Sequence, residues 1–104
     1  MRKYRISGFD SLSEIGEILS AVSDSSKTLG LRPAISSTLK YPTGALIWLL
    51  RKNKQKGHLE VIYDPGVKEI TVVPVADIGD EWANTHARLI ADYLSDRLGG
   101  NLSG

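Results

Sequence analysis

The sequence contains no cysteine. Disulfide bonds, thiol nucleophiles and thiolate metal sites are therefore excluded, and the absence fits a reducing compartment. No apolar run approaches the ~18 residues of a membrane-spanning helix, and the basic N-terminus is not followed by the apolar core of a signal peptide. We therefore expect a cytoplasmic protein that does not enter a membrane.

Residues that commonly carry catalysis are also scarce. The two histidines, His58 and His86, stand at the start of an expected strand and on the apolar side of an expected helix, where histidines typically pack. Asp80, Glu81 and His86 lack the i, i+4 spacing of two metal ligands on one helix. There is neither a glycine-rich phosphate loop nor a Gly-x-Ser-x-Gly elbow. We expect no enzyme activity, cofactor or metal, although two carboxylates brought together by the fold would escape this search.

The chain has 104 residues, of which 41% are hydrophobic and 24% charged, as in an ordinary globular domain. We expect residues 1–100 to form one α+β domain and residues 101–104 to be a flexible C-terminal tail. The net charge of +1 is unevenly divided. Residues 1–58 contain ten Lys and Arg against four Asp and Glu, whereas residues 59–104 contain three against eight. Such a division can steer a partner, unless the fold intermixes the two halves.

Three consecutive strands are expected in the middle of the chain. The first, 45–50, is apolar at every position, which predicts a central strand covered on both faces. The polar segment 53–57 predicts a hairpin loop. The second strand, 58–64, alternates in polarity, and Asp64-Pro65-Gly66 predicts a turn before the third strand, 68–75.

Residues 3–7 predict a fourth strand. Because a helix separates it from the strand at 45–50, we expect these two strands to pair in parallel through a right-handed crossover. Apolar residues at helical spacing predict helices at 11–23, with an end as late as residue 29, and at 80–98. The predicted fold is a two-layer α+β domain of order β-α-β-β-β-α, with a mostly antiparallel four-stranded sheet and both helices on one face.

The segment 30–43 is the most irregular part of the chain, with prolines at Pro33 and Pro42. It is longer than the usual connection of ~4–6 residues. It is either a functional or mobile loop, or a short helical turn anchored by Ile35 and Leu39 that caps the sheet. A small-molecule pocket beneath this segment is one functional alternative.

The strongest functional indication is an excess of apolar surface. If both helices cover one face of the sheet, one side of the strand at 45–50 points away from them, and uncovered apolar patches usually bind a partner. We therefore predict a non-catalytic interaction module, such as a regulator, inhibitor or adaptor, that associates through this face, most simply as a homodimer. Because the sequence does not settle which side is open, the predicted contact residues come from both sides: Leu46, Trp48, Leu50 and Ile62.

Nucleic acid is the alternative partner. Four cations on the predicted hairpin could follow a phosphate backbone: Arg51, Lys52, Lys54 and Lys56. The order helix, three strands, helix resembles that of double-stranded-RNA-binding domains, and with the first strand it resembles that of ribosome-hibernation factors. Asp80-Glu81-Trp82 stands where the first resemblance implies a lysine cluster. The basic hairpin is also consistent with a solubilising loop that blocks edge aggregation.

Overall fold

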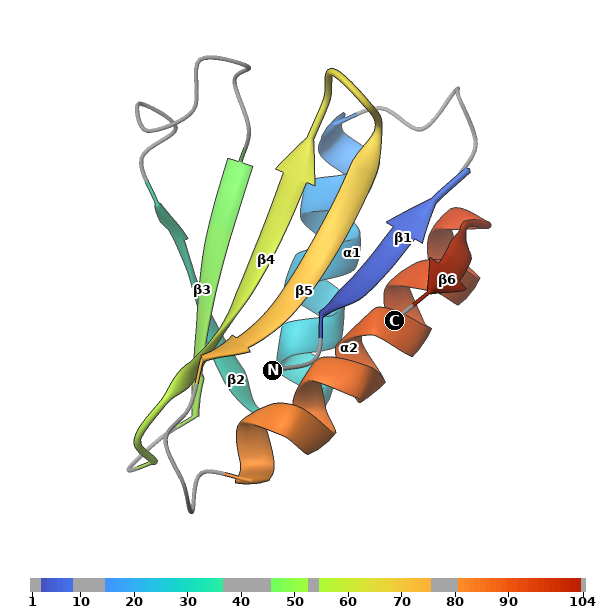
Figure 1. The fold of residues 1–104 in the computed structure, drawn as a ribbon. Helices are drawn as coiled ribbons and strands as arrows, with labels where there is room; N and C mark the ends of the chain where they lie inside the picture. Colours follow the sequence, from blue (N-terminus) through green and yellow to red (C-terminus); the bar gives the residue numbers. More distant parts are fainter. Residues whose placement is uncertain (1–2, 9–14, 37–45, 53–54, 76–80, 104) are drawn as a thin grey trace.

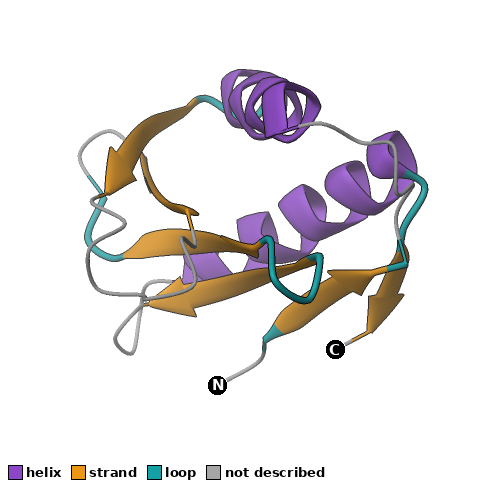
Figure 2. Ribbon diagram, turned by 90° about the horizontal axis from the view of Figure 1, so that it is seen from above, coloured by secondary structure: helices purple, strands orange, loops and turns teal. Residues whose placement is uncertain are grey.

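The computed structural model describes residues 3–8, 15–36, 46–52, 55–75 and 81–103. Two helices, α1 (Ile15–Thr28) and α2 (Glu81–Leu98), lie on one side of a curved sheet (Figure 1 and Figure 2). The described residues form six strands: β1 (Tyr4–Ser7), β2 (Leu31–Ser36), β3 (Leu46–Lys52), β4 (His58–Asp64), β5 (Glu69–Val75) and β6 (Asn101–Ser103). The α+β class and the placement of both helices on one face are as predicted.

The strands lie in the order β2-β3-β4-β5-β1-β6, and every neighbouring pair is antiparallel. The apolar strand β3 lies between β2 and β4, so its predicted central position is confirmed. The predicted parallel pairing of β1 with β3 is wrong. Residues 31–36 occupy that edge of β3 as β2, and β1 instead pairs with β5. The predicted count of four strands is too low because it omits β2 and β6.

β2 comes from the segment in which we expected a loop or a helical turn. Pro33 argues against a strand in the sequence, because proline cannot donate a ladder hydrogen bond. It is tolerated here because β2 is the edge strand of the described sheet, where one side of the backbone needs no partner. Residues 37–43 of the predicted loop, including Leu39, lie outside the described residues.

The C-terminal end of the chain returns to the sheet. α2 ends at Leu98, and Gly99 has a φ of 68°, a left-handed conformation that favours glycine and ends helices. The Gly100 N–H donates to the Ser95 carbonyl at 3.0 Å, and the Ser95 hydroxyl donates to the Gly100 carbonyl at 2.8 Å. This turn directs residues 101–103 into β6 beside β1, so the expectation of a flexible tail is corrected for these residues.

α1 continues through its serine-rich stretch. Ser25 and Ser26 are buried, and their hydroxyls donate to the Val22 carbonyl at 3.0 and 2.7 Å. Hydroxyls that bond back to the preceding turn are satisfied without breaking a helix. Gly30, with a φ of 70°, follows the last turn. The helix therefore ends near the later of the two expected positions.

The hydrophobic core lies between the sheet and the helices. The strands β4 and β5 each point every second side chain into it, as a period of two requires. From α2 the buried set includes three alanines, whose small side chains allow the helix to approach the sheet closely. The core residues of these three elements are Leu59, Val61, Tyr63, Ile70, Val72, Ala83, Ala87, Ile90, Ala91, Leu94 and Leu98.

Candidate interaction surface

The side chains of β3, β4 and β5 alternate between two faces of the sheet. We call the face that packs against the helices the inner face and the opposite one the outer face. No described helix or strand covers the outer face (Figure 2). Four adjoining apolar residues of these strands that lie on it form what we call the outer cluster: Ile47, Leu49, Ile62 and Val73. Val75 lies on the same face at the end of β5, opposite His58.

Strand register makes the outer cluster contiguous. Ile47 stands opposite Ile62 on the neighbouring strand. Glu60 stands between Leu49 on one side and Val73 on the other. Ile47 is only 7% exposed, whereas the other three apolar residues are half-buried. Those three therefore supply the apolar surface that faces solvent.

Three of the four predicted contact residues lie on the inner face. Trp48 is 3% exposed and Leu50 is fully buried, both within the core, and Leu46 is half-buried against it. The register explains this placement, because Trp48 stands opposite the core residue Val61. Ile62 alone of the four lies on the outer face. Trp48 and Leu50 therefore belong to the core rather than to a surface, and Ile62 is the predicted contact residue that lies in the outer cluster.

The outer cluster lies between two charged ends of the same face. At one end Arg32 of β2 stands opposite Arg51 of β3, and both side chains are exposed. At the other end Asp64 of β4 stands opposite Glu69 of β5. Arg5 of β1 lies beside this second end, with its Nε 3.7 Å from Glu69 Oε1. The outer face therefore has the outer cluster around Glu60 in its middle, a basic pair at one end and an acidic pair at the other.

The predicted hairpin cations do not share one face. Arg51 lies on the outer face and Lys52 on the inner face, because successive strand residues alternate. Lys56 is exposed beyond β3, and Lys54 lies outside the described residues. The structure adds Arg32, which sequence reasoning missed. Arg32 could have been found only by recognising residues 31–36 as a strand, because the pairing of that strand places Arg32 opposite Arg51.

Both histidines have partners within the fold. His86 Nδ1 donates to the Trp82 carbonyl at 2.9 Å, and the two rings meet edge to face with centroids 5.6 Å apart. Trp82 Nε1 donates to the Lys56 carbonyl at 2.7 Å, so this unit holds the start of α2 against the β3–β4 hairpin. His58 Nε2 lies 3.4 Å from Glu60 Oε1. Within the described ranges, no three acidic or histidine side chains cluster as metal ligands would, and Asp80 lies outside those ranges.

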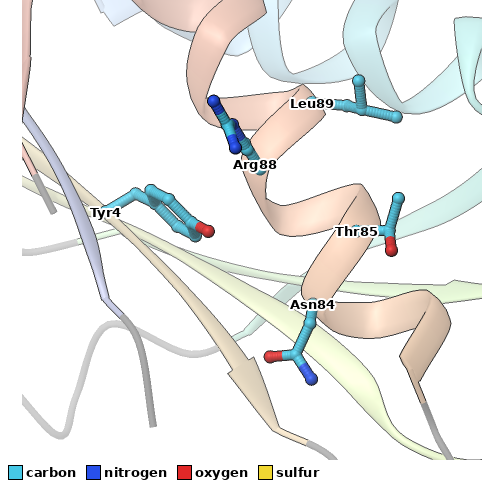
Figure 3. A pocket seen from close by; sticks show the side chains of 5 residues that line it. All are labelled: Tyr4, Asn84, Thr85, Arg88 and Leu89. Carbon is cyan, nitrogen blue, oxygen red and sulfur yellow. The ribbon is translucent and has the colours of Figure 1, made fainter.

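Hollows lined by described residues lie between α1 and α2 and beside strands of the sheet, all away from the outer face. One, of about 580 Å³, lies beside β1 and α2, and Figure 3 shows Tyr4 reaching from its strand toward the helix that carries Arg88 and Leu89. Another, of about 350 Å³, is lined by Leu19, Ser23, Pro33 and Trp48. Pro33 belongs to the segment beneath which a small-molecule pocket was predicted, so this second hollow lies at that place. Among the apolar groups that line this second hollow, the Ser23 side chain supplies one hydroxyl.

None of the described helices combines the length and the apolar character needed to cross a membrane. A scan against protein-family models found no match, and searches of the curated proteins and of the solved structures found none either. Inference about function therefore depends on the geometry of this chain.

Proposed function

We propose that this protein is a non-catalytic interaction module that binds a second copy of itself through the outer face. One observation carries the proposal: the outer cluster lies on a sheet face that no described element covers, while the inner face holds the core. Burial of apolar surface is the main favourable term in protein association. Contiguous apolar groups at a surface therefore commonly mark an interface.

A second copy is the simplest occupant because the outer face carries both signs of charge. Arg32 and Arg51 form its basic end, and Asp64 and Glu69 form its acidic end. In a twofold dimer the same patch meets itself. A patch with both signs can then supply its own complement, whereas a patch of one sign would repel its copy.

Light scattering on a sizing column at protein concentrations from about 1 to 500 µM tests the proposal, since small interfaces commonly dissociate in this range. The wild type is expected to be a dimer at the upper concentrations. The substitution Ile62→Lys places a charge within the outer cluster and is expected to give a monomer. Circular dichroism and thermal unfolding of the variant establish that it is folded.

Leu89→Lys is the matched control. Leu89 is 45% exposed on α2, so the same kind of change is made on the helix side of the sheet, away from the outer cluster and both charged ends. This variant is expected to dimerise like the wild type. A wild-type monomer at every concentration would overturn the proposal, and so would an equal loss of association in the two lysine variants.

Nucleic-acid binding is the second candidate function. It is favoured by Arg32 and Arg51, since two opposed exposed cations with no acidic partner among the described residues would gain from binding phosphates. A gel shift with RNA and DNA at low and moderate salt tests it. The Arg32→Ala/Arg51→Ala variant and a quadruple alanine variant at Arg51, Lys52, Lys54 and Lys56 should lose binding. Absence of binding by the wild type would end this candidate.

A further inference from the structure

Each charged end of the outer face is a like-charge pair on adjacent strands. Arg32 stands directly opposite Arg51, and Asp64 directly opposite Glu69. Like charges in opposed cross-strand positions destabilise a sheet. Among the described residues neither arginine has an ion-pair partner, and Glu69, which is 31% exposed, has only the 3.7 Å contact with Arg5. Both ends therefore keep charge that a partner of opposite sign would neutralise.

The two ends are separated by the length of a strand, with the outer cluster between them. Arg51 lies level with the start of β4, because Leu50 stands opposite Leu59. Asp64 is the last residue of β4, which has seven residues. Six steps along a strand span about 20 Å. One face thus carries two opposite charge pairs about 20 Å apart along the strands.

On the premise of the proposed function, we propose that two copies stack outer face on outer face with their strands antiparallel. The basic end of each copy then lies over the acidic end of the other. A twofold axis that lies between the two sheets produces this arrangement and repeats the contact at both ends. The axis is inclined from the perpendicular to the strands, because the acidic pair on β4 and β5 lies two strands across from the basic pair on β2 and β3. The outer clusters of the two copies meet in the middle.

The same charges oppose the other twofold arrangement, in which the strands of the two copies run parallel. That stack would place the two basic ends together at one end of the dimer and the two acidic ends together at the other. Charge complementarity sets the orientation and register of an interface more than its affinity. The charge pairs therefore select the antiparallel stack, while the outer cluster supplies the apolar contact.

The outer face is small for an interface. The six strands have three to seven residues each. At about 3.3 Å per residue and about 4.8 Å between strands, they give a flat area of about 500 Å² per copy, compared with about 800 Å² per partner in a typical stable complex. We therefore expect a dimer with a Kd in the micromolar range. Because salt screens exposed charges, the Kd is expected to rise with ionic strength.

Two charge-changing variants test the arrangement by analytical ultracentrifugation. The basic-end variant carries Arg32→Glu and Arg51→Glu. The acidic-end variant carries Asp64→Asn and Glu69→Lys, and its asparagine keeps the Oδ1 atom that accepts the Gly66 N–H at 2.9 Å. In the antiparallel stack each variant alone opposes like charges at both ends, so its Kd should rise at least tenfold. An equal mixture of the two variants should form mixed dimers with a Kd near that of the wild type.

A parallel stack predicts a different pattern. The basic-end variant would keep the wild-type Kd, because like charges are opposed before and after the change, and the acidic-end variant would dimerise more tightly. That pattern would overturn the antiparallel arrangement and leave dimerisation through the outer face intact. A wild-type monomer would instead end the proposed function and this inference together.

The control variant changes net charge without touching the outer face. Lys27→Glu and Arg88→Glu alter exposed positions on the two helices and shift the net charge as much as the basic-end variant does. This control should dimerise like the wild type. If it weakens the dimer as much as the basic-end variant, the effect is one of net charge, and the antiparallel arrangement is overturned.

Discussion

Leu49 and Leu50 are consecutive residues of β3 in contrasting environments. Leu50 is fully buried on the inner face opposite Leu59, whereas Leu49 is half-buried on the outer face opposite Glu60. The inner face packs against two helices of the same chain, and the outer face has no described element over it. Substitution of Leu50 therefore tests the stability of the fold, and substitution of Leu49 tests self-association.

The two faces also differ in how their polar groups are paired. Throughout the described part of the chain, every buried side-chain nitrogen or oxygen has a hydrogen-bond partner, and Ser25 and Ser26 show how this is achieved within α1. On the outer face, by contrast, Arg32 and Arg51 stand opposite one another without a described acidic partner. The buried polar groups are therefore satisfied within the chain, whereas the two outer-face arginines keep charge that the proposed dimer would pair.

Leu50→Ala should have the largest effect on the free energy of unfolding. Removal of three carbons from a fully buried leucine loses transfer free energy and leaves a cavity, which costs about 2–5 kcal/mol. Urea unfolding, followed at a protein concentration below the dimer Kd, measures this loss for the monomer. A loss below about 1 kcal/mol would mean that the inner face is not the closely packed one, and the contrast between the faces would fail.

Trp82→Phe should have an intermediate effect on the side of the sheet that carries the helices. It removes the Nε1–H that donates to the Lys56 carbonyl at 2.7 Å, and a hydrogen bond of this kind contributes about 1 kcal/mol. Urea unfolding measures the stability change, and hydrogen exchange should become faster at the amides of residues 55–57. Unchanged exchange there would show that the indole does not hold the hairpin to α2.

Much of the fold follows from sequence periodicity, and what was missed involves pairing between distant segments. The alternating pattern of β4 and the apolar run of β3 predicted both strands and the central place of β3. β2 was missed because Pro33 reads as a loop residue when the edge position that tolerates it is unknown. Because β2 was not predicted, one edge of β3 had no assigned neighbour, and β1 was placed there.

The candidate site was less predictable than the fold, because exposure depends on which side the helices cover. The sequence indicated that one side of β3 is uncovered, but an all-apolar strand looks the same from both sides. Trp48 and Leu50 were therefore grouped with Ile62, although they lie on opposite faces. Likewise, prediction of the like-charge pair Arg32 and Arg51 requires the register between β2 and β3. That register cannot be read from the composition.

Leu49→Ala should have the smallest effect on unfolding, because it removes the same atoms as Leu50→Ala from a side chain that already meets solvent. The expected loss in the monomer is below about 1 kcal/mol, since less apolar area leaves a buried environment and little cavity forms. Self-association should weaken several-fold in ultracentrifugation, because Leu49 lies in the outer cluster. Equal losses of unfolding free energy in the two leucine variants would show that the outer face is as well covered as the inner one. In that case the apolar surface on which the proposed dimer depends would not be available.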